Sequence, residues 1–262
     1  MIILNLDPVA FSIGPLSVRW YGIAYALGLI CGYSIAKRLN KINNALTTER
    51  LDSLLIYMMI AIICGGRLGY VLFYHPDMLM SDILGIFRIW EGGMSFHGAF
   101  MAMILAIYIF TQKHRLHFFS VSDLIVCAVP IGILFGRIAN FINGELYGRV
   151  TNVMWGVVFS SGGHLSRHPS QLYEAVGEGL LNAILLPLIY IGACTNNKRR
   201  GLCSGLFMLN YSIVRMIVEE FRDYDYGYTV TISHHIFSEG QILCIPMFIG
   251  SIVLIASAVK YK

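Results

Sequence analysis

Seven apolar runs of about twenty residues recur along the chain, and each is long enough to cross the hydrocarbon core of a bilayer. Hydrophobic residues make up 56% of the chain and charged residues 13%, about half the charged share of an average soluble domain. Inside a bilayer, such a run satisfies its backbone by forming an α-helix. The sequence therefore predicts an all-α integral membrane protein with seven transmembrane helices, at residues 17–36, 53–74, 94–112, 119–138, 171–194, 202–220 and 237–258.

The basic residues predict the orientation of these helices, because lysine and arginine concentrate in the cytoplasmic loops of membrane proteins. All the lysines and several arginines follow the first, third, fifth and seventh runs, so we assign those loops to the cytoplasm. The N-terminus then faces outward and the C-terminus inward. The residues concerned are Lys37, Arg38, Lys41, Arg50, Lys113, Arg115, Lys198, Arg199, Arg200, Lys260 and Lys262.

The chain is expected to form a single transmembrane domain, residues 1–262, that carries one insertion on its outer side. This insertion, residues 139–170, includes NVMWGVVFS, which is typical of a short β-strand beside glycine-rich turns. We expect it to fold into a small extracytoplasmic cap. The start of the chain lacks a basic region and a small-residue cleavage site, so no removable signal peptide is expected.

Polar residues within the apolar runs lie at similar depths. Tyr21 and His97 are near the outer ends of their runs, and Arg67, Arg137 and Arg215 lie in the outer halves of theirs. At about 1.5 Å per residue, all five fall within about 5–12 Å of the outer boundary. An ionisable group at that depth costs at least about 2–3 kcal/mol. We therefore expect these groups to pair, to face a water-filled cavity, or to do both.

Arg215, Glu219 and Arg222 have the spacing i, i+4, i+7, which places them on one helix face. One interpretation is that Arg215 and Glu219 only neutralise each other. The other is that several outer-side arginines bind an anion, because the planar guanidinium suits phosphate where water is scarce. Beside an apolar bundle, the phosphate of a lipid head group fits this second interpretation, with its acyl chains among the helices.

His97 lies in GGMSFHGAF, where flanking glycines permit close approach of a backbone or a ligand. It can be a hydrogen-bonded histidine at a helix end, or a general base, because imidazole titrates near neutral pH. The chain has no GxSxG, HExxH or P-loop motif. Its six cysteines are scattered in or beside apolar runs, which favours buried thiols over disulfides or a metal site.

The segment GRIANFINGELYGR, residues 136–149, closely resembles the signature of the bacterial prolipoprotein diacylglyceryl transferases. Further segments resemble this family in the same order along the chain. Two positions depart from the family, because Ala99 and Ala139 stand where glycine is usual, and we expect modest repacking there. The matching segments are FSIGPLSVRWYGIAY, GGRLGYVLFY, GGMSFHG, HPSQLYE and RMIVEEFR.

The resemblance implies a multi-pass protein of the bacterial cytoplasmic (inner) membrane, with its active site toward the outer leaflet. It implies transfer of the diacylglyceryl group of phosphatidylglycerol to the lipobox cysteine of prolipoprotein signal peptides, which forms a thioether and releases glycerol phosphate. Membrane lipids are further partners; no cofactor, metal or nucleic acid is expected. The site residues that it implies are catalytic His97, Arg137, Arg215 and Glu219, and substrate-binding Tyr21, Arg67, Asn140, Asn143, Glu145, Gly148 and Arg222.

Each of these residues is expected to have a separate role in the reaction. Arg137 and Arg215 would hold the phosphate, and Glu219 would orient Arg215. Asn140 and Glu145 would shape the head-group pocket, and Tyr21 would position the lipid. His97 is a candidate base for the thiol, but a carboxylate or the departing phosphate could take that proton instead.

Two other classes of membrane protein were weighed against an enzyme of this kind. A lipid-binding or transporting protein without chemistry would use the same arginines, but the sequence has no inverted repeat or paired broken helices, which many transporters show. An intramembrane protease would need a nucleophile with a base, or paired aspartates, and neither pattern is present.

Overall fold

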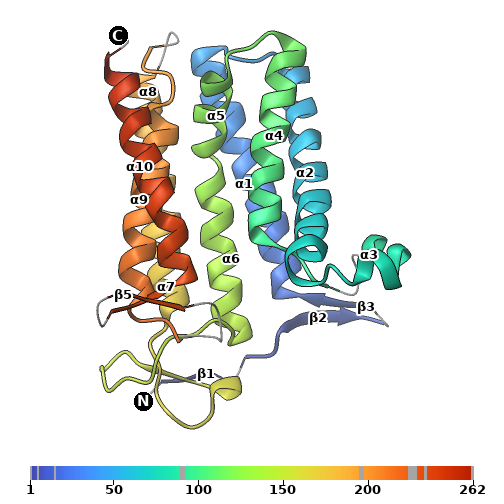
Figure 1. The fold of residues 1–262 in the computed structure, drawn as a ribbon, viewed down its shortest axis with the longest axis vertical. Helices are drawn as coiled ribbons and strands as arrows, with labels where there is room; N and C mark the ends of the chain where they lie inside the picture. Colours follow the sequence, from blue (N-terminus) through green and yellow to red (C-terminus); the bar gives the residue numbers. More distant parts are fainter. Residues whose placement is uncertain are drawn as a thin grey trace. The chain divides into compact units, whose positions relative to one another are not determined.

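The computed structural model describes residues 2–4, 6–14, 16–88, 92–194, 198–223, 229–232 and 235–260, and it is mainly helical (Figure 1). The chain forms two compact units. One contains residues 1–43 and 123–262, and the other contains residues 44–122. The prediction of a single transmembrane domain therefore stays a prediction.

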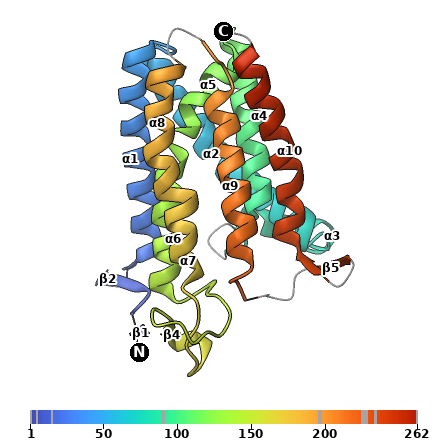
Figure 2. The same ribbon diagram turned by 90° about the vertical axis from the view of Figure 1, so that its left-hand side faces the viewer.

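The larger unit is built from long helices that pack in pairs. α1 (Trp20–Asn43) packs against α6 (Val129–Asn143), and α9 (Leu202–Glu219) packs against α10 (Glu239–Lys260). Both ribbon views show α9 and α10 side by side along most of their lengths (Figures 1 and 2). A further helix contacts both α6 and α9. It is composed of α7 (Ser170–Glu174), the π-helix η4 (Ala175–Leu180) and α8 (Leu181–Ala193), which follow one another without a break.

The smaller unit is a helix pair with a short connection. α2 (Thr48–Tyr74) packs against α4 (Phe96–His114), and α3 (Met78–Ser81) and the 3₁₀-helix η1 (Ile83–Phe87) join them. The two long helices cross closely at glycines: a Cβ atom added to Gly98 would lie 2.3 Å from the carbonyl oxygen of Gly65. Small residues at such crossings let helix backbones approach each other in membranes.

Asp123 fixes the start of α9, although α5 (Phe118–Val126) carries it. Its carboxylate is buried and accepts hydrogen bonds from the backbone N–H groups of Gly201 (2.7 Å) and Ser204 (2.8 Å), and from the Ser204 hydroxyl (2.7 Å). The first N–H groups of a helix have no partner within the helix, and a carboxylate there also faces the positive end of the helix dipole. Asp123 therefore caps α9 from a neighbouring helix.

Among the described residues, three two-stranded sheets accompany the helices, whereas the sequence predicted a single short strand in an otherwise all-α fold. β4 (Val157–Phe159) confirms the strand predicted in NVMWGVVFS and pairs in parallel with β1 (Ile2–Leu4). β2 (Val9–Ile13) pairs antiparallel with β3 (Leu16–Arg19), and β5 (Thr229–Ile232) with β6 (His235–Ser238). These strands have only three to five residues, so a search for apolar spans of about twenty does not detect them.

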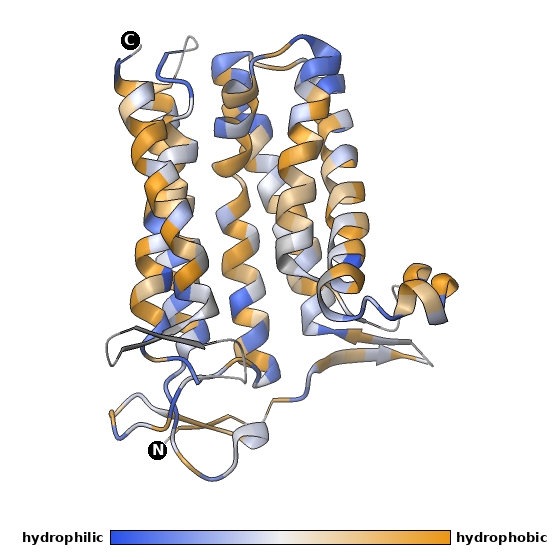
Figure 3. Cartoon of the chain, viewed as in Figure 1, coloured by the Kyte–Doolittle hydropathy of each residue, from blue (hydrophilic) through white to orange (hydrophobic). Residues whose placement is uncertain are grey.

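Five helical segments in the described part of the chain are long and apolar enough to cross a membrane. They are Thr48–Leu72, Phe118–Asn143, Ser170–Ala193, Leu202–Glu219 and Gly240–Lys260. Helices α1 and α4 coincide with the other two predicted spans but fall outside these five. Figure 3 shows apolar residues over most of α8, α9 and α10. The chain is thus a multi-pass membrane protein, whereas seven spans and their orientation stay predictions.

Three helices, α1, α2 and α6, extend beyond the ends of their predicted spans. The basic residues assigned to the first loop lie in helices, because α1 continues to Asn43 and α2 begins at Thr48. No glycine or proline interrupts the chain after the apolar run, so α1 extends past it until Asn44 adopts φ 47°. Likewise, residues 139–143 belong to α6 and not to the cap. That helix ends where Gly144 adopts the left-handed conformation, with φ 65°.

The close crossing of α2 and α4 predicts a local sensitivity to side-chain size. Gly98→Ala should destabilise the protein by about 1–3 kcal/mol, because the new methyl group would overlap backbone atoms of α2. Thermal unfolding in neutral detergent measures this effect. Gly192→Ala in α8, where the added atom would have open space, should leave the melting temperature unchanged or raise it. Equal effects of the two substitutions would contradict this account of the crossing.

Candidate active site

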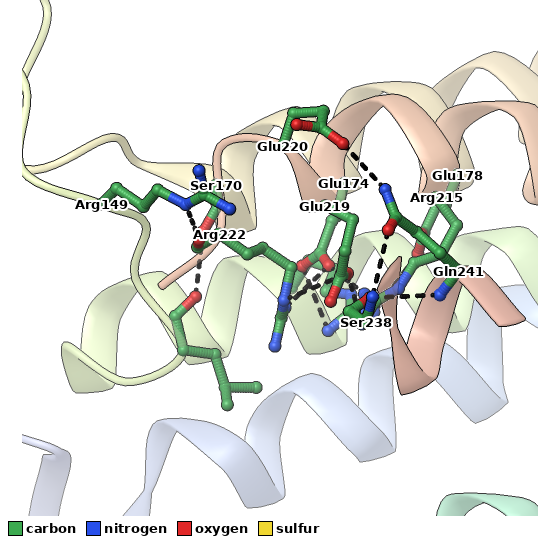
Figure 4. Close-up of polar contacts among 12 residues, drawn as sticks. Arg149, Ser170, Glu174, Glu178, Arg215, Glu219, Glu220, Arg222, Ser238 and Gln241 are labelled. Atoms are coloured by element: carbon green, nitrogen blue, oxygen red, sulfur yellow. Dashed lines mark hydrogen bonds and ion pairs between the residues drawn. The ribbon is translucent and has the colours of Figure 1, made fainter. Parts of the chain in front are cut away.

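Three arginines and three glutamates from four helical segments form one buried group of ion pairs in the larger unit. We call it the ion-pair cluster. Figure 4 shows how the side chains from α7, η4 and α9 converge. The members are Arg137 on α6, Glu174 on α7, Glu178 on η4, Arg215 and Glu219 on α9, and Arg222 just beyond α9.

Glu174 is the centre of the ion-pair cluster, because its carboxylate contacts all three arginines. One oxygen, Oε2, lies 3.2 Å from Arg137 Nη1. The other, Oε1, accepts a hydrogen bond from Arg222 Nη1 at 2.9 Å and another from Arg215 Nη1. The side chain of Glu174 has no exposed surface. A single buried carboxylate thus joins α7 to α6 and to the end of α9.

The other two carboxylates complete the ion-pair cluster with fewer contacts. Glu219 Oε2 lies 3.1 Å from Arg215 Nη2 and 3.6 Å from Arg222 Nε. Glu178 Oε2 accepts one hydrogen bond, from Arg137 Nη2 at 3.3 Å. The predicted pairing of Arg215 with Glu219 at i, i+4 is therefore confirmed, and each also takes part in contacts beyond that pair.

The arginine side chains of the ion-pair cluster are more exposed than its carboxylate side chains. The side chains of Arg137, Arg215 and Arg222 are 18%, 16% and 14% exposed. Those of Glu174 and Glu178 are fully buried, and that of Glu219 is 8% exposed. The arginine side chains are thus the members of the ion-pair cluster with the most exposed surface. Guanidinium groups suit recognition of phosphate or carboxylate.

Glycines let η4 approach both helices that carry arginines. A Cβ atom added to Gly177 would lie 2.5 Å from the Val214 side chain on α9, and one added to Gly179 would lie 2.8 Å from the Leu134 backbone on α6. Asn210 on α9 also donates a hydrogen bond to the Gly177 carbonyl at 2.9 Å. A π-helix widens the turn and is frequent at functional sites. Here it carries Glu178 between α6 and α9.

A second polar group lies where α6 ends. Asn140 Nδ2 donates hydrogen bonds to the Tyr21 hydroxyl at 2.7 Å and to Glu145 Oε1 at 2.8 Å. Asn143 Nδ2 lies 3.5 Å from the same Glu145 oxygen. Glu145 also lines a pocket of about 280 Å³, whose other lining residues are Gly144, Leu146, Tyr147, Ser161 and Asp223. Four predicted substrate-binding residues thus form one hydrogen-bonded group.

The sequence comparisons identify the family. Residues 8–257 match the family described as prolipoprotein diacylglyceryl transferase. The phosphatidylglycerol–prolipoprotein diacylglyceryl transferase of Rickettsia bellii (strain OSU 85-389) is 45% identical over 252 residues, covering 96% of this chain and 95% of the relative. That of Pasteurella multocida (strain Pm70) is 46% identical over 257 residues, covering 97% and 93%. The chain belongs to this family.

Gly148 connects the family signature to the end of α9. Its N–H donates to the His168 carbonyl at 2.8 Å, and it forms a bridge with Arg222. A Cβ atom there would lie 2.2 Å from the Phe221 carbonyl oxygen, so only glycine fits. Nearby, partial burial lowers the pKa of the His168 imidazole. Gly148 therefore serves packing beside the ion-pair cluster, and its role in substrate binding stays a prediction.

Two predicted site residues of this transferase belong to the smaller unit. Arg67 is buried, and its guanidinium binds backbone carbonyls of the segment before α4. His97 lies in the first turn of α4, but its side chain is outside the described part of the structure. The roles of both residues remain predictions. The carbonyls that Arg67 binds are those of Gly85, Ile86, Gly92 and Gly93.

Sequence reasoning missed the two carboxylates that contact Arg137. Neither Glu174 nor Glu178 is among the site residues predicted from the sequence. A usable signal existed, since both lie in a predicted membrane span, where an ionised group needs an opposite charge. The sequence also did not predict that the start of α10 contacts the end of α9. There, Gln241 Nε2 donates a hydrogen bond to Glu220 Oε1 at 2.9 Å (Figure 4). There Gly240 lies against Arg215, so α10 also supports the ion-pair cluster.

The central position of Glu174 predicts a large loss of stability when its charge is removed. Glu174→Gln should destabilise the protein by about 3–5 kcal/mol, because three buried guanidiniums would lose their shared partner. Thermal unfolding in detergent measures the change. Glu49→Gln, the same substitution at an exposed position in the first turn of α2, serves as the control and should cost less than about 1 kcal/mol. A melting temperature unchanged by Glu174→Gln would refute the central role of this carboxylate.

Proposed function

We propose that this chain transfers the diacylglyceryl group of phosphatidylglycerol to the thiol of a lipobox cysteine in prolipoproteins. The products are a thioether and glycerol phosphate. Membership of the family supports this activity, as do the names of its relatives. The proposal places the enzyme in the bacterial inner membrane, with its active site toward the outer leaflet, where it meets both lipids and signal peptides.

The observation that carries the proposal is the exposed face of the arginines. Arg137, Arg215 and Arg222 come from two helices, α6 and the end of α9, yet contact one carboxylate. Their side chains are therefore held close together and remain partly exposed. In our proposal, the head-group phosphate binds to this face, and its oxygens receive hydrogen bonds from the guanidiniums.

Such an arrangement would also favour the reaction itself. The thiol sulfur attacks a saturated carbon of the diacylglyceryl group, and the bond from that carbon to a phosphate oxygen breaks with its electron pair. The phosphate therefore gains negative charge in the transition state. Guanidiniums that are already fixed in place stabilise that charge without reorganisation, and this lowers the barrier.

The remaining roles follow from the second polar group and the histidine. Tyr21, Asn140, Asn143 and Glu145 would bind the glycerol hydroxyls of the head group, because they offer donors and acceptors beside a pocket. His97 would accept the thiol proton as general base. A carboxylate or the departing phosphate remains the alternative acceptor.

Removing either of two arginines should abolish transfer while the protein still inserts into the membrane. Arg137→Ala and Arg215→Ala should each lower kcat/KM by at least about 10²–10³-fold, as expected for loss of a group that stabilises transition-state charge. Transfer is measured as a mass gain on the cysteine of a lipobox peptide, with phosphatidylglycerol in detergent. Arg38→Ala, at an exposed position of α1, should retain normal activity. Near-normal transfer by either active-site variant would exclude that arginine as a phosphate ligand.

The role of His97 predicts a change in pH dependence. If its imidazole takes the thiol proton, His97→Gln should lower kcat and remove the acidic limb of the profile of kcat against pH. The same peptide assay, run across a pH series, measures this change. Retained activity with an unchanged profile would exclude His97 as the base.

The peptide assay also separates transferase activity from the lipid-binding alternative. A protein that only binds or moves phosphatidylglycerol would deplete or relocate the lipid without a mass gain on the peptide cysteine. A peptide in which serine replaces the cysteine is the matched negative control, because it lacks the thiol nucleophile.

A further inference from the structure

The ion-pair cluster is electrically neutral before any substrate binds. Its three guanidiniums are matched by three carboxylates, so the formal charges cancel. The head group of phosphatidylglycerol carries one negative charge. If it binds to the arginines with nothing else changed, the buried group acquires a net negative charge, which a low-dielectric site strongly disfavours. Something in the cluster must therefore compensate.

Glu178 is the carboxylate that the cluster holds least firmly. It contacts one arginine, Arg137, at 3.3 Å, whereas Glu174 contacts three arginines and Glu219 contacts two. Its second oxygen, Oε1, is buried and has no hydrogen-bond partner among the described residues. An incoming phosphate oxygen can replace Glu178 on Arg137 at the cost of one contact, while Glu174 continues to hold that arginine.

We propose that the phospholipid head group takes the place of Glu178 on Arg137 and that Glu178 takes up one proton as this happens. This inference rests on the proposed function, because it assumes that the arginines bind the phosphate. The proton comes from water, and no other covalent bond changes. The neutral cluster, the lipid phosphate with one negative charge and one proton together give a complex that is again neutral.

The surroundings of Glu178 favour the protonated form once Arg137 is occupied. The side chain is fully buried, and burial without a cation disfavours a carboxylate. The nearest remaining carboxylate, Glu174, repels a second negative charge. Helix α8, which also packs against η4, contributes no charged residue. The titratable or charged groups that act on Glu178 from the packed helices are Arg137 on α6, Glu174 on α7, Tyr211 and Arg215 on α9, and Cys244 on α10.

Calorimetry can count the proton directly. The unaltered protein in neutral detergent is titrated with phosphatidylglycerol, without peptide, in buffers that differ in ionisation enthalpy. At neutral pH we expect uptake of close to one proton per lipid bound. Glu178→Gln should reduce this number to near zero and tighten binding at least several-fold, because the cluster then carries one net positive charge. Zero uptake by the unaltered protein would overturn the proposal, even if the variant did not fold.

Matched controls assign the proton and separate the two proposals. Glu49→Gln removes an exposed carboxylate outside the ion-pair cluster and should keep the uptake. Diacylglycerol, which lacks phosphate, should bind without proton uptake. Undiminished uptake in Glu178→Gln would place the proton elsewhere, for example on His97, and so refute the role of Glu178. If Arg137→Ala and Arg215→Ala bind phosphatidylglycerol normally, the phosphate site itself is wrong. If these two arginine variants lose binding, the phosphate site is supported. The number of protons taken up by the unaltered protein and by Glu178→Gln then tests the role of Glu178.

Discussion

The carboxylate of Glu174, shared by three arginines, is the interaction on which the rest of the larger unit depends. An arginine within a membrane span is tolerated only when an opposite charge or water compensates it. Arg137 lies on α6, which carries no carboxylate, and Glu219 on α9 is shared by Arg215 and Arg222. Folding of α6, α7 and α9 against one another is therefore coupled to neutralisation of these charges, and the fold and the candidate site cannot be separated energetically.

This coupling requires close packing of the helices around the ion-pair cluster. Glu174 and Glu178 reach the arginines only if α7 and η4 come close to both α6 and α9. The glycines of η4 permit that approach, and a Cβ atom at either one would overlap a neighbouring helix. The same requirement applies at the end of α9, where Gly148 meets the Phe221 carbonyl. At Gly148, Gly177 and Gly179, the small residue lies where the charges must converge.

The sequence predicted features that arise within one segment and missed those that arise between segments. Apolar runs predicted a helix in each of seven places, and the i, i+4 spacing predicted the contact of Arg215 with Glu219. Spacing along one helix cannot reveal the contact of Arg215 with Glu174, which lie 41 positions apart. Helix ends were misplaced for a related reason: α1 continues to Asn43 because nothing in its sequence stops it, whatever the length of the apolar run.

A buried anion-binding site made of arginines must be stable both when it is empty and when it holds its ligand. While it is empty, its arginines need carboxylate partners, or the buried positive charge would destabilise the fold. When it binds an anion, those same carboxylates compete with the ligand for the guanidiniums. Unequal partners resolve the conflict. Glu174 and Glu219, with several contacts each, keep the arginines in place in both states, and Glu178, with a single contact, is the partner that can be exchanged. The number of contacts that each carboxylate makes thus distinguishes Glu174 and Glu219, which keep the arginines in place, from Glu178, which the phosphate can replace.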